Sequence, residues 1–245
     1  SGSLRSMTIE NLQAYYRQAD EVDLREGLQA YKLYNKTMHA FAEHYGHPLD
    51  RVCAVFCALS PNNDYRGNLR SLASVLDGYN RGVPVEQVTI STYEHCRDRA
   101  WLYLDGQKDY VESVTGPKIL SFYQNILDPE DPEPVTIDGH MVCCWYDKDV
   151  PMKDALFLLR GGEGYNAIAS GCRKMAGDLG LVPNQLQAIL WFTRKRIKNI
   201  RAELQYDLWS DPDDVWGTFW PPEKAPPFPT YQGPEPRSVE RVMVC

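Results

Sequence analysis

The segment that most restricts the fold is residues 116–144, in which two helices start on either side of a short loop. Pro117 is typical of the first position of a helix, because a helix start leaves that N–H unpaired in any case. The apolar pattern after it predicts a helix to about residue 127. A proline-rich acidic loop follows, and Asp138 then takes the N-cap position of a second helix, ahead of an apolar run. The segment therefore places Lys118 at the start of one helix and Asp138 at the start of the next.

Two interpretations of Lys118 and Asp138 are open. A lysine and a carboxylate at neighbouring helix starts can form a catalytic pair. They can equally be a solvated lysine and a capping aspartate, because Asp is among the preferred N-cap residues.

Apolar residues recur at helical spacing along most of the chain, which predicts an all-α fold with about nine or ten helices and marginal strands. Residues 85–90 are either a short strand or part of a loop. Two capping boxes are expected, one at Asp23 and Glu26 and one at Ser91 and Glu94. The helices are expected at residues 8–19, 23–45, 49–60, 64–77, 91–104, 117–127, 138–145, 153–159, 165–179 and 183–206.

Residues 49–60 are nearly all apolar, which is typical of a central core helix. Pro61 ends this helix, and a polar turn of Asn62, Asn63 and Asp64 caps the next one. The turn either delivers polar side chains to one end of the core or is simply a well-capped connection.

Cysteines and glycines give no sign of a metal or cofactor. Most of the seven cysteines lie in apolar helical context, which indicates reduced, buried thiols in a cytoplasmic protein. Cys53 and Cys57 have a spacing that suits a metal, but no second pair with ligand spacing accompanies them. The glycines around residue 162 follow no strand and form no dinucleotide fingerprint. We therefore expect no metal and no cofactor.

The charge is unevenly distributed. The net charge of −7 argues against tight, non-specific binding to nucleic acid, which requires neutralisation of phosphates. Residues 194–201 nevertheless form a basic stripe, which is either a nucleic-acid contact or a solvated helix face. No run of 18 apolar residues occurs, so no membrane span is expected.

The two ends differ from the middle of the chain. Residues 1–7 are expected to be a cloning remnant or disordered, and residues 8–209 to form one helical domain. Eight of the seventeen prolines lie in the last 36 residues, so residues 210–245 are expected to form an extended arm. Nearby tryptophans should attach part of this arm to the domain.

Three short motifs follow one another along the chain: ALSP at residues 58–61, GPK at 116–118 and IDGH at 137–140. In this order, over about residues 50–201, they resemble the helix-hairpin-helix DNA glycosylase superfamily. Members of that superfamily have a Leu-Ser-Ala-Gln-like turn, then a hairpin ending in Gly-x-Lys, then a Val-Asp-Thr-His-like segment. The resemblance implies a two-lobed, all-α, DNA-glycosylase-like fold, here with the Pro/Trp-rich arm added.

The resemblance also implies roles. Asp138 takes the position of the family's essential carboxylate, which stabilises positive charge on the sugar. Lys118 takes that of the lysine nucleophile of lyase-active members, which forms a Schiff base. The target base is flipped out of the duplex. Substrate or DNA binding is implied for Asn62, Asn63, Asp64, Gly116, His140, Arg194 and Arg196.

The hairpin departs from the family pattern. Ser113 and Val114 stand where the family has proline and glycine, Gly139 replaces its threonine, and the four-cysteine iron–sulfur loop of some members is absent.

A bacteriophage branch with such a degraded hairpin is similar to this chain. Its members have been described as thymidine pyrophosphorylases and as amino acid:DNA transferases of thymine hypermodification. This likeness implies that an amine displaces pyrophosphate from an activated 5-hydroxymethyluracil, in the cytoplasm of an infected bacterium.

Three other functions stay open: a DNA glycosylase, a non-catalytic nucleic-acid- or protein-binding module of the same fold, and an enzyme of small nucleotides. The expected partners of the favoured function are duplex DNA with a modified or damaged base and a small amine or amino-acid co-substrate. No membrane partner is expected.

Overall fold

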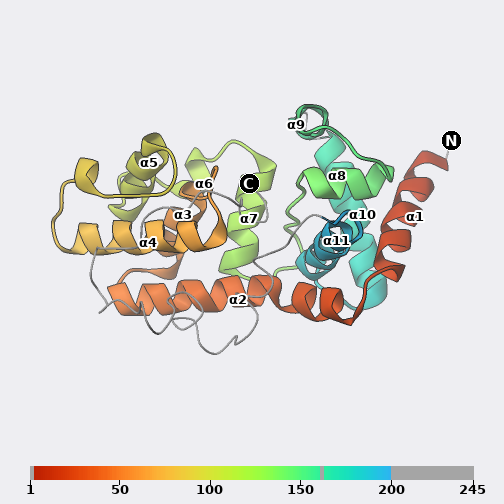
Figure 1. Ribbon diagram of the computed structural model, residues 1–245, viewed down its shortest axis with the longest axis horizontal. Coiled ribbons are helices and arrows are strands. Elements are labelled where there is room, and N and C mark those ends of the chain that lie inside the picture. The colour runs from red at the N-terminus through yellow and green to blue at the C-terminus, as the bar shows by residue number, and fades with distance from the viewer. Residues whose placement is uncertain (1–2, 161–162, 200–245) are drawn as a thin grey trace. The chain divides into compact units, whose positions relative to one another are not determined.

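The computed structural model describes residues 3–160 and 163–199, and all regular secondary structure in these ranges is helical (Figure 1). Eleven α-helices, one short 3-10 helix and no strand occur within the described ranges. The all-α prediction is therefore confirmed. The expected arm at residues 210–245 lies outside the described residues.

All ten predicted helices are found, most of them with shifted ends. The first six α-helices and the 3-10 helix are α1 (Ser3–Arg17), α2 (Glu21–Tyr45), α3 (Leu49–Ala58), α4 (Tyr65–Asn80), η1 (Val85–Gln87), α5 (Glu94–Leu104) and α6 (Tyr110–Ser113). The other five are α7 (Pro117–Leu127), α8 (Gly139–Tyr146), α9 (Met152–Arg160), α10 (Glu163–Leu179) and α11 (Pro183–Ile197). α6 was not predicted, and η1 occupies the segment left open between strand and loop. α11 ends earlier than predicted, and residues 200–206 of that prediction lie outside the described part.

The described residues form two compact units. The first unit contains the residues up to Tyr34 and those from Thr115 onward, and the second contains Asn35–Val114. The boundary falls within α2, so each unit includes one part of that helix.

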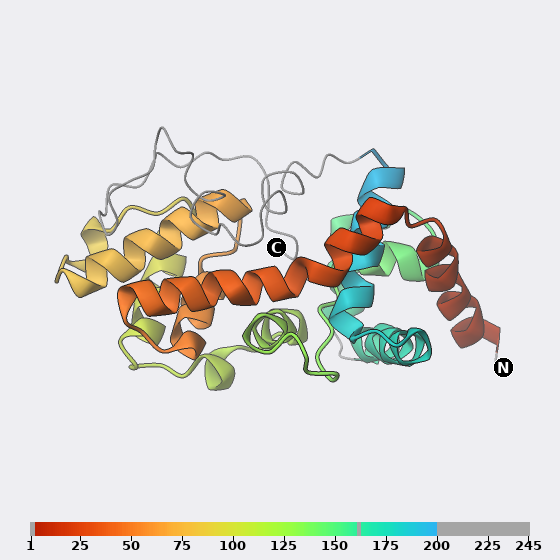
Figure 2. The same ribbon diagram turned by 90° about the horizontal axis from the view of Figure 1, so that it is seen from below.

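The first unit is a helical cluster around one apolar core. α1, α8, α10 and α11 pack on one another, and both views show them together (Figures 1 and 2). The core is supplied by the apolar faces of these helices and by the segment that leads into α8. Ile137, Met141, Val142 and Leu190 are fully buried. Burial of apolar surface is the main stabilising contribution to such a unit.

The second unit is organised around α3. This helix packs on α5 and α4, and Val52, Val55 and Phe56 are fully buried. The prediction of a central core helix at this position is confirmed.

Two expected capping boxes have different partners in the structure. The Asp20 and Asp23 side chains accept hydrogen bonds from each other's backbone N–H, at 2.8 and 3.1 Å, so the box lies three residues earlier than predicted. Ser91 does not cap α5. Its hydroxyl donates instead to Asn63 Oδ1 at 2.8 Å and to the Gly67 carbonyl at 2.9 Å. The prediction of the second capping box was wrong, because the Ser91 hydroxyl bonds residues distant in the sequence and not the start of α5.

Candidate functional site

Asp138 is a buried carboxylate at the start of α8. Its Oδ1 accepts a hydrogen bond from the Met141 N–H at 3.0 Å, which confirms the predicted N-cap. The side chain is 4% exposed. No donor among the described residues bonds its other oxygen, Oδ2. Oδ1 thus caps the helix, and Oδ2 has no hydrogen-bond donor among the described residues.

The segment before Asp138 is held by buried polar side chains. Tyr165 accepts from the Ile137 N–H at 3.0 Å and donates to the Val135 carbonyl at 2.5 Å. Asn125 donates to the Pro134 carbonyl at 3.0 Å and accepts from the Thr136 hydroxyl at 2.9 Å. These buried hydrogen bonds restrict the backbone just before Asp138 and so help to hold the carboxylate in place.

His140 lies in the first turn of α8, and its ring meets the Trp191 ring edge-on at 6.1 Å between centroids. Burial lowers the pKa of His140. The Asp138 charge raises that pKa, whereas Lys195, Arg194 and Lys118 lower it further. Burial thus favours the neutral imidazole over the charged form.

Lys118 occupies the second position of α7, after Pro117, as predicted. It is partly exposed, and its charge is close enough to lower the pKa of His140. Lys118 and Asp138 form no ion pair with each other among the described contacts. Lys118 and Asp138 therefore both act electrostatically on His140, but they are not joined by a direct ion pair. Gly116 is the N-cap of α7, in extended backbone, with open space where a Cβ would lie.

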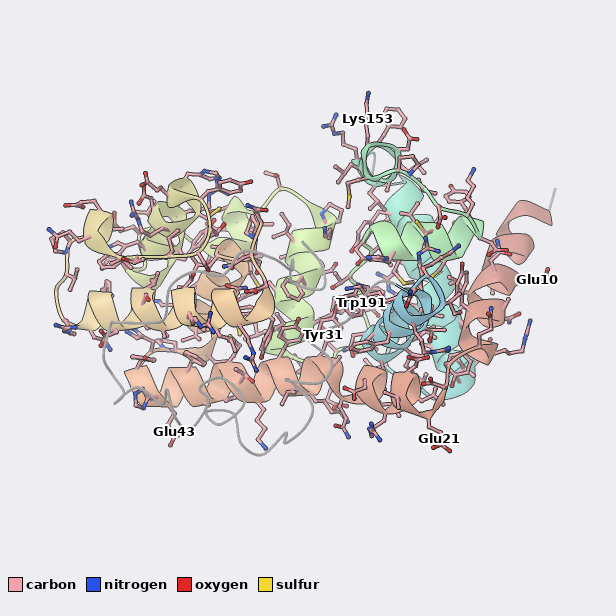
Figure 3. The ribbon with its side chains drawn as sticks, viewed as in Figure 1. Glu10, Glu21, Tyr31, Glu43, Lys153 and Trp191 are labelled. Carbon is pink, nitrogen blue, oxygen red and sulfur yellow. The ribbon has the colours of Figure 1, made fainter. Side chains whose placement is uncertain are left out.

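α11 contributes Trp191, which the sequence did not indicate, and Lys195, which was expected only as a member of the basic stripe. The Lys195 ammonium lies 4.1 Å from the centroid of the Trp191 ring, a cation–π contact. Figure 3 labels Trp191 on this helix. The available signal was a row of polar or polar-tipped residues four apart, Gln187, Trp191 and Lys195.

Arg194 and Arg196 have partners within the first unit. Arg194 is 4% exposed and donates to Asp149 at 2.6 Å and to the Tyr15 hydroxyl at 3.2 Å. Arg196 forms ion pairs with Asp23 at 2.8 Å and Asp20 at 3.1 Å. A DNA phosphate would have to displace these carboxylates, so DNA contact by the two arginines stays a prediction.

The turn at residues 62–64 belongs to the second unit. Asn62 is exposed with a φ of 50°, and Asn63 donates to the Leu59 carbonyl at 3.1 Å. Asp64 caps α4 by accepting from the Gly67 N–H at 2.5 Å, and burial raises its pKa. The contacts fit a well-capped connection, and substrate binding by this turn stays a prediction.

Two of the buried thiols, Cys53 and Cys172, are poor nucleophiles. Five cysteines that the sequence indicated as buried are buried and free: Cys53, Cys57, Cys143, Cys144 and Cys172. Burial raises the pKa of Cys53 and of Cys172 to about 12 in each case. Thiolate chemistry at neutral pH is therefore disfavoured at both positions.

The fold and the site define an all-helical protein with a buried carboxylate and a neutral imidazole at one helix start. The chain belongs to a family of unknown function, DUF7178, whose profile matches residues 1–199. No curated protein and no solved structure matches the chain. Within the described ranges, no helix has the length and apolar character needed to cross a bilayer.

Proposed function

We propose that this protein is a DNA-base-modifying transferase with a glycosylase-like two-lobed fold. It acts on a flipped-out, 5-hydroxymethyluracil-derived base in bacteriophage DNA. The observation that supports this most is Asp138, a buried carboxylate with one oxygen bonded to the helix start and the other without a donor among the described residues. A fixed carboxylate of this kind stabilises positive charge as it develops in a transition state.

The proposed reaction is a displacement at carbon. The nitrogen of an amine attacks the methylene of the pyrophosphorylated 5-hydroxymethyl group, and a C–N bond forms. The C–O bond to pyrophosphate breaks, and the pyrophosphate leaves with the electron pair. The new nitrogen then loses a proton.

Each residue of the site has a task in this step. Asp138 stabilises the positive charge on the methylene and on the attacking nitrogen. His140, which burial keeps neutral, accepts the proton. Lys118 offers a positive charge to the departing pyrophosphate, since it is partly exposed and close to His140.

A glycosylase is the second candidate, because the same carboxylate can stabilise a sugar cation. Lys118 would then attack the sugar carbon and form a Schiff base. The product distinguishes the two candidates: a glycosylase releases a free base, whereas the transferase leaves a modified base in the DNA.

Mass spectrometry of nucleosides and free bases tests the proposal. The protein is incubated with duplex DNA carrying common lesions and, separately, with DNA carrying pyrophosphorylated 5-hydroxymethyluracil together with amino acids. A new modified nucleoside in the second reaction is expected. Free base in either reaction would support the glycosylase instead. No change in either, with measurable DNA binding, would favour a non-catalytic binding module.

A further inference from the structure

Gln187, Trp191 and Lys195 lie on one face of α11, because residues four apart are neighbours on a helix surface. Gln187 is 0% exposed and Trp191 is 3% exposed. The Gln187 Oε1 accepts a hydrogen bond from the Tyr31 hydroxyl at 2.7 Å. The amide oxygen is therefore committed, and the amide nitrogen remains for another partner. Trp191 and Tyr31 are both labelled in Figure 3.

Two donors on this face have no acceptor among the described residues. They are the Nε2 of Gln187 and the indole Nε1 of Trp191, and both are buried. Native proteins pair nearly all buried polar groups, because an unpaired donor loses its hydration without compensation. Two such donors on successive turns indicate an acceptor from outside the described residues.

The charges around this face favour a negative acceptor. The Lys195 ammonium lies over the Trp191 ring, and Lys118 and Arg194 are near enough to act on His140, which contacts the same ring. Asp149 is the ion-pair partner of Arg194, and the charges of Asp138, Lys118 and Lys195 all act on the His140 imidazole. His140 is partly exposed, so this cluster reaches the surface of the unit.

We propose that Gln187, Trp191 and Lys195 form an oxyanion-binding site for the small substrate of this protein. The amide and indole N–H groups donate to its oxygens, and the Lys195 ammonium supplies the charge. The identity of the oxyanion rests on the proposed function: it is either the carboxylate of the amino acid or the pyrophosphate that leaves.

The test is an NMR titration of the full chain without DNA. The indole N–H resonance of Trp191 is assigned by its loss in Trp191→Phe. Glycine and inorganic pyrophosphate are the two probes. Glycinamide is the matched control, since it has the amine of glycine but no carboxylate. We expect at least one probe to shift the Trp191 resonance saturably, and glycinamide to leave it unchanged.

Two variants of α11 complete the test. Lys195→Met keeps the bulk of the side chain and removes the charge, and it should weaken binding roughly tenfold or more. Lys198→Met removes an exposed cation just past the end of α11, where Lys198 pairs with Asp149 at 3.5 Å. It should change binding by less than about twofold.

The outcomes of the titration distinguish a carboxylate subsite, a leaving-group subsite and the absence of a site. A shift with glycine alone identifies a carboxylate subsite, and a shift with pyrophosphate alone identifies the leaving-group subsite. No saturable shift with either probe, or equal affinity in wild type and Lys195→Met, overturns the proposal. Because the titration involves no turnover, a failure to form modified nucleosides would leave its result unchanged.

Discussion

At Asp138 a structural role and a proposed chemical role occupy one side chain. Oδ1 caps α8, and Oδ2 has no donor among the described residues. Asp138→Ala should therefore lose about 1 kcal/mol of stability through the cap alone, besides any activity. Asn keeps the capping oxygen, since Asn and Asp cap helices about equally well. The Asn variant is thus the one that separates the two roles.

The buried carboxyl group of Glu26 should make the free energy of unfolding depend on pH. It is 6% exposed, and its Oε2 has no hydrogen-bond partner in the described part. Burial raises the pKa of Glu26 from 4.5 to about 7, against a smaller lowering by Arg25. The folded state thus holds this proton more tightly than the unfolded chain does. The stabilising contribution is complete below the unfolded pKa and is lost as the pH rises through about 7.

Glu26→Gln should remove this dependence. Between about pH 5 and pH 8, wild type should lose about 3 kcal/mol of unfolding free energy relative to the variant. Urea denaturation of both proteins at the two pH values measures the difference. Parallel stability curves for the two proteins would contradict the assignment.

Among the helices, α2 and α11 approach each other closely at Gly27. A Cβ added there would lie 2.3 Å from the Ile189 side chain and 2.6 Å from the Ile189 backbone nitrogen. The backbone cannot move aside cheaply, so Gly27→Ala should cost about 3 kcal/mol.

The matched control is Gly177→Ala in α10, where an added Cβ has open space. It should stabilise the protein by about 0.5–1 kcal/mol, because alanine restricts the unfolded chain more than glycine does. Urea denaturation compares the two variants. A neutral Gly27→Ala would show that the two helices are not in close contact there.

Helix starts were predictable where local chemistry sets them. Pro117 and Asp138 act within their own turns, so their positions could be read from the sequence. Ser91 resembled a cap by the same rules but donates to Asn63 and Gly67, which lie more than twenty residues away in the chain. Hydrogen bonds between residues distant in the sequence cannot be predicted from the local residue pattern. The same holds for a close contact between helices such as that of Gly27 with Ile189.

For the molecule as a whole, the sequence indicated Asp138 as a candidate but did not predict which residues surround it. Asp138, Lys118 and His140 came from one continuous segment and a family resemblance. Trp191 and Lys195 lie on a helix about fifty residues later and meet His140 only through packing. The burial of Arg194 and its ion pair with the exposed Asp149 were likewise not predicted, because a basic run on a helix normally faces solvent.

The charge distribution also makes a prediction about DNA binding. The net charge is −7, and both Arg194 and Arg196 are already paired. The protein should therefore neutralise few phosphates of undamaged duplex DNA. The slope of log binding constant against log salt concentration should then be smaller in magnitude than about 3. Fluorescence anisotropy across a salt series measures this slope. A much steeper slope would show that the basic stripe binds phosphate after all.

The most direct test of the central claim is the activity of Asp138→Asn on DNA with pyrophosphorylated 5-hydroxymethyluracil, with amino acid supplied. Nucleoside mass spectrometry gives the rate, and thermal denaturation in parallel gives the stability. We predict a melting temperature within about 2 °C of wild type and a rate at least ~100-fold lower, because Asn caps the helix but has no negative charge. A variant that forms the modified nucleoside at the wild-type rate would show that Asp138 is only a helix cap.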